Sequence, residues 1–287
     1  MNRGTAASEL PPRAGPVAEA HIRRVRPGQD PCSGVDQLVG EEPLEIRAAG
    51  PGQHALPVAV TMRTPGDDFE LATGFLISEG IAPDASSVLS ARYCPTADQQ
   101  RLHNVVVARL SVPVHPGVGA RTYATSSCGL CGKASLEQLA WRCDPLRHGP
   151  RVARSAVAGM AERLRSAQPL FSTTGGLHGA GLFDSTGELV AAREDVGRHN
   201  AVDKLIGYAA RSGMGPLGDY VVMVSGRVGY EIVQKIAMAR IAVLCAVSAP
   251  SSLAVETAER FGVALAGFVR DGGFNIYSHP ERFELGS

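Results

Sequence analysis

The sequence predicts an α/β protein with a smaller α+β unit over residues 37–117 and a larger α/β unit over residues 118–287. In the larger unit, apolar strand-like segments alternate with helical segments of 10–15 residues, which is typical of a largely parallel sheet covered by helices. In the smaller unit, four strand-like segments surround one helical segment, which favours mainly antiparallel pairing. The chain has 287 residues, 44% apolar and 20% charged, within the range of folded globular domains.

The first 36 residues are rich in Pro, Gly, Ala and Arg and show neither a strand nor a helix period. This composition predicts a mobile tail, in which Cys32 is incidental.

In the smaller unit, strands are expected over residues 43–50 and 56–63, on either side of a Gly50-Pro51-Gly52 turn. Residues 65–80 predict a helix, because the segment begins with acidic residues, carries regularly spaced apolar residues and ends at Gly80. Two further strands are expected over residues 86–94 and 104–112.

The larger unit begins with a Ser/Gly/Cys loop over residues 125–133. Helices are expected over residues 135–142, 153–167, 199–213, 229–240 and 251–262. Strands are expected after a glycine-rich turn within 173–184, and over 187–197, 220–226, 241–248, 263–270 and 274–278.

Composition and charge exclude several classes of protein. Lys plus Arg and Asp plus Glu number 28 each, whereas a broadly basic nucleic-acid binder needs surplus cations to displace counterions from phosphates. The longest apolar run, IAVLCAV from Ile241, is far shorter than the roughly 20 residues of a membrane span. The N-terminus lacks an apolar signal core, and six Cys are too few for a disulfide framework. A soluble, cytoplasmic protein is therefore expected.

Lysine is rare in this chain. Only Lys133, Lys204 and Lys235 occur among the 28 basic residues, and all three fall in chemically unusual segments. Codon bias towards Arg is the simple explanation of the low ratio of Lys to Arg. The alternative is that these three positions require a compact ammonium group, where a planar guanidinium would not serve.

Three small, polar turns follow predicted strands, at Ser225-Gly226-Arg227, Ser248–Ser252 and Arg270–Gly273. In an open α/β sheet, ligands bind beyond the carboxyl ends of the strands and near helix N-termini. Arg227 and Arg270 suit bidentate contact with phosphate, and Ser251 or Ser252 can cap the next helix. The sequence thus favours a phosphate-bearing ligand, although short turns need Gly and Ser in any case.

Charged residues also gather between Glu194 and Lys204, with His199 and Asp203 at helical i, i+4 spacing. A solvated charged face is the simple interpretation, but apolar residues on the same segment require it to pack as well. Upstream, His178 lies between glycines, where another group can approach the backbone closely.

The pair Cys128 and Cys131, in the sequence CGLC, allows four interpretations. Cys143 and His148 offer plausible further ligands for structural zinc, and a redox-active dithiol also uses a CxxC pair. A zinc deaminase would need an upstream H-x-E, which does not occur. A persulfide carrier needs a reactive thiolate on a mobile segment, and neighbouring Ser and Gly residues together with Lys133 provide suitable surroundings.

Eight segments together resemble the formate dehydrogenase accessory sulfurtransferase family, FdhD. They are EEPLEIR, TMRTPGDD-x-E-LATGFL-x-SEGI, CGLCGK, STTGGLHGAGLF, REDVGRHNAVDKLIG, SGRVGYEIVQK, SAPSSLAVETA and GFVRDGGFNIYSHPERF, and the resemblance covers nearly all of the chain from about residue 37 to 283. The resemblance implies a cytoplasmic sulfurtransferase that takes sulfur from a cysteine desulfurase. The sulfur is passed to bis(molybdopterin guanine dinucleotide) molybdenum cofactor for formate dehydrogenase. It also implies a C-terminal three-layer α/β domain similar to cytidine deaminases, without their zinc.

The resemblance assigns roles to particular residues. Cys128 corresponds to the persulfide carrier, and Cys131 to an assisting thiol. The cofactor segment corresponds to Phe268, Val269, Arg270, Asp271, Gly272, Gly273, Asn275 and Tyr277, and the strand-exit argument adds Ser225, Gly226 and Arg227. A guanine nucleotide is expected to occupy this site, and no resident metal is expected. A non-catalytic chaperone for the cofactor or the apoenzyme is the alternative.

A homodimer is expected from the helix predicted over residues 229–240. Its apolar residues Ile232, Val233, Ile236, Ala237 and Met238 cover more than one face, and such a helix needs a second cover. The alternative is that the sheet and the smaller unit of the same chain cover all apolar faces of this helix.

Overall fold

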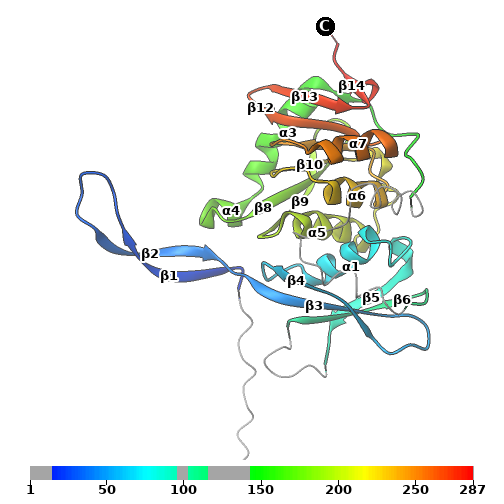
Figure 1. Ribbon diagram of the computed structural model, residues 1–287, viewed down its shortest axis with the longest axis horizontal. Helices are drawn as coiled ribbons and strands as arrows, with labels where there is room; N and C mark the ends of the chain where they lie inside the picture. The colour runs from blue at the N-terminus through cyan, green and yellow to red at the C-terminus, as the bar shows by residue number, and fades with distance from the viewer. Residues whose placement is uncertain (1–14, 96–102, 116–142, 287) are drawn as a thin grey trace, which may run out of the picture.

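The computed structural model describes residues 15–95, 103–115 and 143–286. Two main sheets organise this α/β protein (Figure 1). The smaller sheet has the order β4-β3-β6-β5 and consists of β3 (Glu42–Ala49), β4 (Leu56–Arg63), β5 (Val88–Tyr93) and β6 (Val105–Leu110). The helical elements within this part of the chain are α1 (Asp68–Ser78) and a 3-10 turn, η1 (Ala85–Ser87), among the described residues. The strands and the helix that were predicted for this part of the chain are therefore present.

The larger sheet has six strands in the order β13-β12-β11-β10-β8-β9. They are β8 (His178–Phe183), β9 (Leu189–Asp195), β10 (Val221–Val224), β11 (Val243–Ala246), β12 (Ala264–Arg270) and β13 (Gly273–Ser278). The helices are α3 (Arg154–Ser166), α4 (Pro169–Thr174), α5 (Arg198–Arg211), α6 (Tyr230–Met238) and α7 (Ser252–Phe261). Short elements complete the unit: β7 (Val152–Ala153), η4 (Leu217–Asp219), η5 (Pro280–Arg282) and β14 (Phe283–Glu284).

Helices cover both faces of the larger sheet because successive side chains of a strand point to opposite faces. On β10, Val222 belongs to the core shared with α5, α6 and α7. Its neighbours Val221 and Met223 belong to the core shared with α3. The same alternation on β11 and β12 produces three layers, with the sheet in the middle.

The larger sheet is less parallel than predicted. Strands β10, β11 and β12 are parallel, but β8 pairs antiparallel with both β10 and β9, and β13 pairs antiparallel with β12. Short hairpins force this direction, because too few residues connect the strands for a crossover. Between β12 and β13, Asp271 and Gly272 have φ values of 52° and 75°, the left-handed pair that favours a two-residue hairpin turn.

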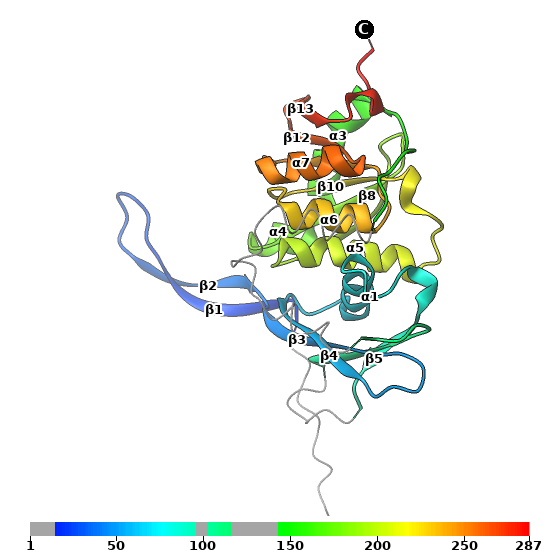
Figure 2. The same ribbon diagram turned by 45° about the vertical axis from the view of Figure 1, so that its right-hand side comes forward.

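The prediction of an unstructured tail over residues 1–36 is wrong for its second half. Strands β1 (Val17–Arg24) and β2 (Cys32–Val39) form an antiparallel ribbon that projects from the body (Figures 1 and 2). Most of its side chains are exposed, so backbone pairing supplies the order without the apolar periodicity that reveals a buried strand. The base of the ribbon packs beside α4, where Val39 lies against Gly176.

The two sheets are joined through a close crossing of α1 and α5, which lie side by side in both views (Figures 1 and 2). A Cβ atom at Gly74 on α1 would overlap the carbonyl oxygen of Asp203, and a Cβ atom at Gly207 on α5 would overlap that of Glu70. Only glycine permits backbones to approach this closely. One hydrophobic core runs continuously from β3 and α1 to α5 and α6.

Helix α6 is covered by its own chain. Ile232, Val233, Ile236 and Ala237 are each at most 1% exposed, and the helix contacts α1, α5 and α7. The apolar residues on more than one face of this helix are therefore covered by the same chain. They do not support the homodimer that the sequence led us to expect. Among the described residues, no helix is long and apolar enough to cross a membrane.

Candidate functional site

The carboxyl edge of the larger sheet brings two of the predicted strand exits together. The amide of Val228 donates to the carbonyl of Ala249 at 3.1 Å, and the amide of Ser251 donates to the carbonyl of Val228 at 2.9 Å. The amide of Phe268 donates to the carbonyl of Ser248 at 3.2 Å. The turns after β10 and β11 and the distal part of β12 therefore form one continuous edge.

The turn after β10 holds three predicted residues in different surroundings. Ser225 is part of the framework, because its hydroxyl accepts a hydrogen bond from the amide of Gly179 at 2.9 Å. Gly226 lies against His178, whose Nδ1 would be only 3.1 Å from a Cβ atom at position 226. Arg227 is exposed, so its guanidinium is free to reach a ligand.

The turn after β11 leads into α7. Ser251 is the N-cap of this helix, and its hydroxyl accepts from the amide of Ala254 at 3.2 Å. The expected cap is thus confirmed, and oxyanion binding at this turn stays a prediction.

The predicted cofactor segment at the end of β12 is one arm of the β12–β13 hairpin. The turn at Asp271-Gly272 lies beyond the last paired residues of β11 and β12, which are Cys245 and Ala266. Val269 is fully buried in the core beneath α3, so its side chain is not available to a ligand.

The neighbouring residues of this arm are more accessible. The Arg270 guanidinium carbon lies 5.4 Å from the centre of the Phe268 ring. Asn275 is exposed and pairs with Gly267, and the Tyr277 ring packs against the same glycine. Asp271 and Gly272 are exposed at the tip, and Gly273 pairs with Arg270.

The same edge carries basic side chains that the sequence-based site did not include. Because β8 is antiparallel to β10, His178 at the start of β8 lies beside the end of β10. Arg198 and His199 form the first turn of α5, directly after β9. Burial lowers the pKa of His178, and the positive charges of Arg198, His199 and Arg227 lower it further. The short connection between β8 and β9 is the sequence signal that could have located these residues. It implies an antiparallel hairpin, in which the start of β8 and the end of β9 lie at the same edge of the sheet.

The charged cluster from Glu194 to Lys204 serves mainly to hold the structure together. The Glu194 carboxylate accepts hydrogen bonds from the amides of Leu170 and Phe171 at 3.0 and 2.7 Å, at the start of α4. Lys204 pairs with Asp195 at 2.8 Å. Both Glu194 and Lys204 line a pocket of about 350 Å³ between the β4–α1 loop and the α3–α4 connection.

The second ion pair of this cluster links α5 to α6. Asp203 accepts a hydrogen bond from the Ser78 hydroxyl at 2.6 Å and pairs with Lys235 at 2.9 Å. His199 pairs with Glu231 at 3.0 Å. The predicted i, i+4 partners His199 and Asp203 therefore have different partners on different elements.

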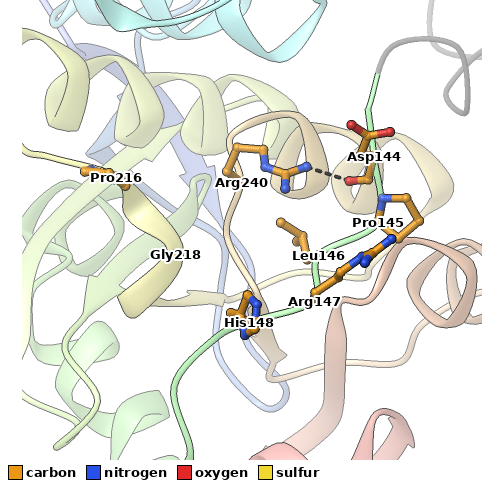
Figure 3. Close-up of a pocket in the computed structure, with 8 residues that line it drawn as sticks. All are labelled: Asp144, Pro145, Leu146, Arg147, His148, Pro216, Gly218 and Arg240. Atoms are coloured by element: carbon orange, nitrogen blue, oxygen red, sulfur yellow. Dashed lines mark hydrogen bonds between the residues drawn. The ribbon is translucent and has the colours of Figure 1, made fainter.

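A larger pocket lies near the opposite edge, where the strands begin. It has a volume of about 520 Å³ and is lined by Asp144 to His148, Pro216, Gly218 and Arg240 (Figure 3). The Arg240 guanidinium donates to the carbonyl of Asp144. His148, which the sequence offered as a candidate zinc ligand, lines this pocket, whereas the residues predicted for sulfur transfer and cofactor binding are not among its lining residues.

The cysteines outside the CGLC pair differ in access. Burial raises the pKa of the Cys245 thiol to about 12 and also raises the pKa of Cys143. The Cys143 thiol donates to the carbonyl of Ala237 at 3.3 Å, which is a packing role. Cys94 is buried and Cys32 is exposed. Cys128 and Cys131 lie outside the described residues, as does the helix predicted over residues 135–142.

Comparison with known proteins extends these observations to the whole chain. Residues 39–284 match the model of the FdhD/NarQ family. A sulfur carrier protein FdhD from Streptomyces avermitilis is 49% identical over 266 residues, covering 87% of this chain and 90% of the relative. One from Sulfurisphaera tokodaii is 44% identical, covering 86% and 91%.

A solved structure has the same fold. It is that of a protein assigned as a formate dehydrogenase accessory protein from Desulfotalea psychrophila, with a TM-score of 0.73 and 24% identity. The match covers 93% of this chain and 99% of that one. The family model and the relatives each cover most of the sequence. This chain belongs to the FdhD/NarQ family.

Proposed function

We propose that this protein is a sulfur carrier in the maturation of formate dehydrogenase. Cys128 receives sulfur from a cysteine desulfurase as a persulfide and passes it to bis(molybdopterin guanine dinucleotide) molybdenum cofactor. The names of the relatives support the carrier role, and the CGLC pair supplies candidate thiols. The proposal makes the protein a sulfurtransferase.

Sulfur loading is a thiol exchange at the terminal sulfur of the donor persulfide. The Cys128 thiolate attacks that sulfur, the sulfur–sulfur bond of the donor breaks, and the donor cysteine leaves as a thiolate. A buried thiol with a raised pKa is a poor attacking group. This argument disfavours Cys143 and Cys245, and Cys94 is also buried. Cys128, Cys131 and the exposed Cys32 are left to be compared by experiment.

The observation that carries the acceptor half of the proposal is the cationic carboxyl edge of the larger sheet. His178 and Arg198 both lie against Gly226, and the exposed Arg227 follows it directly. A dinucleotide brings phosphates that suit such an edge. The Phe268–Gly273 arm and Asn275 or Tyr277 would then contact the base or the pterin. The cofactor would be the substrate that accepts the sulfur.

Mass spectrometry after incubation with a cysteine desulfurase and cysteine tests the carrier role directly. We expect one added sulfur on the peptide that contains Cys128, and its loss in Cys128→Ser. Cys32→Ser is the matched control, since it removes an exposed thiol from the ribbon, and it should load normally. Sulfur found only on Cys32, Cys94, Cys143 or Cys245 would overturn the assignment of Cys128.

A non-catalytic chaperone is separated by the same variants. If Cys128→Ser and Cys131→Ser still support formate dehydrogenase activity in cells that lack the wild-type protein, the chain binds its partners without moving sulfur.

The proposal further includes a cytoplasmic location, a homodimer and a likeness of the larger unit to cytidine deaminases. Light scattering at micromolar concentration tests the homodimer.

A further inference from the structure

We propose that the pocket near the amino ends of the parallel strands binds an extended, acidic peptide segment of a partner protein. This is the pocket of about 520 Å³ that is lined by Asp144 to His148, Pro216, Gly218 and Arg240. Its volume is within the usual range for sites that take a ligand larger than a simple ion. The inference does not depend on sulfur transfer.

One wall of the pocket is the segment 144–149, which is held firmly although it belongs to no helix or strand. The amide of Leu146 donates to the carbonyl of Phe261 at 2.9 Å. The buried guanidinium of Arg282 donates to the carbonyls of Leu146 and His148 at 3.0 and 3.3 Å. The wall is therefore preformed, and a ligand does not have to order it on binding.

The main-chain hydrogen bonds of this wall leave one edge available. Leu146 and His148 bond to the body of the protein, and Pro145 and Pro150 favour extended backbone at the residue before each of them. In extended chain, the main-chain groups of successive residues point to opposite sides. Arg147, between the two bonded residues, forms no main-chain hydrogen bond with any residue that the structure describes. Its amide and carbonyl therefore offer a free strand edge, the feature that extended peptides recognise.

Basic side chains line the same pocket. Arg147, His148 and Arg240 are exposed, and none of them forms an ion pair within the described part of the chain. The acidic residue of the lining is Asp144, whose carboxylate points away from Arg240 and His148 (Figure 3). Guanidinium groups bind carboxylates through two parallel hydrogen bonds. The charge of the lining therefore favours a ligand that carries carboxylates.

The other lining residues are small or apolar, namely Pro145, Leu146, Pro216 and Gly218. Proline rings and a leucine suit the apolar side chains of a peptide. Among the described lining residues there is no Phe, Tyr or Trp, the rings on which nucleobases commonly stack. A peptide in which acidic and apolar residues alternate fits this lining better than a nucleotide does.

Arg240 occupies a backbone position that favours glycine. It follows the end of α6 with a φ of 60°, in the left-handed region where Gly is the usual residue after a helix. Its guanidinium donates to the carbonyl of Asp144 and contacts the thiol of Cys143 through one terminal nitrogen. Its other nitrogens donate to no residue that the structure describes. The strained position therefore holds a side chain whose remaining N–H groups are available to a carboxylate.

Fluorescence anisotropy with a labelled peptide tests the site. The probe is a short peptide in which Glu and Val alternate, and the control peptide has Lys in place of Glu. We expect the full-length protein to bind the Glu peptide and not the Lys peptide. Arg147→Ala and Arg240→Gly should each weaken binding by roughly tenfold to a hundredfold. Arg109→Ala is the matched control, because it removes an exposed guanidinium from β6, outside the pocket, and affinity should not change.

Charge reversal provides a stronger test of the same site. Arg147→Glu combined with Arg240→Glu should abolish binding of the Glu peptide and create binding of the Lys peptide, because the attractive and repulsive pairs exchange. Equal affinity of the wild type for both peptides would overturn the proposal. Unchanged affinity for the Glu peptide in both Arg147→Ala and Arg240→Gly would overturn it as well. Inorganic phosphate that competes as strongly as the Glu peptide would show a site for small anions instead.

Two further measurements separate binding from structure. N-methylation of the central amides of the Glu peptide blocks main-chain pairing and should weaken binding roughly tenfold, whereas equal binding would refute the pairing with Arg147. The Arg147 side chain forms no hydrogen bond or ion pair with a described residue, so Arg147→Ala should keep the melting temperature of the free protein and lose the peptide-induced rise. A lower melting temperature with an undiminished rise would make Arg147 a structural residue and overturn the proposal.

Discussion

The ammonium nitrogen of Lys204 lies 2.8 Å from a carboxylate oxygen of Asp195, and neither residue is more than 1% exposed. Lys204 also donates to the carbonyl of Thr64 at 3.0 Å, and Asp195 accepts from the amide of the same residue at 3.1 Å. The pair therefore joins α5 and β9 of the larger unit to the β4–α1 loop. It is a buried connection between the two sheets.

Lys204→Ala should lower the free energy of unfolding by about 3–5 kcal/mol, because it leaves the buried charge of Asp195 without its ion-pair partner. Urea unfolding followed by circular dichroism measures the change. Arg23→Ala is a suitable control, since it removes a cation from an exposed position of β1, and it should change stability by less than about 0.5 kcal/mol. A loss below 1 kcal/mol in Lys204→Ala would show that the pair contributes little.

Lys204→Arg and Lys235→Arg should also destabilise the protein. Lys235 donates to Asp203, Glu79 and Ser78 at 2.8–3.0 Å and is 4% exposed. The branched guanidinium is larger than an ammonium and carries its donors in a fixed plane. We expect losses of about 1–3 kcal/mol in urea unfolding from overpacking. Wild-type stability in both variants would mean that codon bias explains the retained lysines.

Gly74→Ala should weaken the α1–α5 crossing, because the added methyl group would overlap the carbonyl oxygen of Asp203. Backbone atoms cannot give way as a flexible side chain can, so a loss of about 1–3 kcal/mol is expected. The matched control is Gly215→Ala, where a Cβ atom would meet nothing within 4 Å. Equal stability of the two variants would show that the helices can separate freely.

Stability should fall at mildly acidic pH because of His178, whose pKa lies below the ordinary value of 6.5 owing to burial and neighbouring cations. Above pH 6.5 this imidazole is neutral in both states. As the pH falls through 6.5, the unfolded chain binds the proton before the folded protein does, and the free energy of unfolding decreases.

Urea unfolding of wild type and His178→Gln at pH 7.5 and pH 5.5 isolates this effect from the other histidines. The drop in stability should be smaller in His178→Gln, because this variant lacks the imidazole whose pKa differs between the folded and unfolded states. Equal drops in the two proteins would contradict the lowered pKa.

The distal ribbon should be dispensable for folding. Replacing residues 22–34 by Asn-Gly joins His21 to Val35, which are paired in the ribbon, through a two-residue turn. Little apolar surface is buried there, so unfolding in urea should change by less than about 0.5 kcal/mol. Val39→Lys, at the base against Gly176, should cost more. A large loss from the shortened ribbon would mean that its tip contacts the body or a partner.

Local pattern alone predicted most elements of this protein. The helix from Asp68 to Ser78 and the alternating segments from His178 to Ser278 agree with the structure, because amphipathic period, caps and glycine turns are properties of neighbouring residues. The strand exits at Ser225 and Ser248 were also predicted, because strands β10 and β11 are connected through a helix and are therefore parallel. The motifs that define the family are local in the same sense.

Tertiary structure decided what depends on pairing between distant segments. The antiparallel direction of β8 brings His178 to the same edge as Gly226, whereas a parallel strand would have placed it at the opposite edge. The β1–β2 ribbon is ordered by backbone pairing that leaves no apolar period in its sequence. The charges of Asp195, Asp203, Lys204 and Lys235 are buried because their partners come from other elements. Hydrogen bonds and ion pairs of this kind act through space, so the order of residues along the chain does not reveal them.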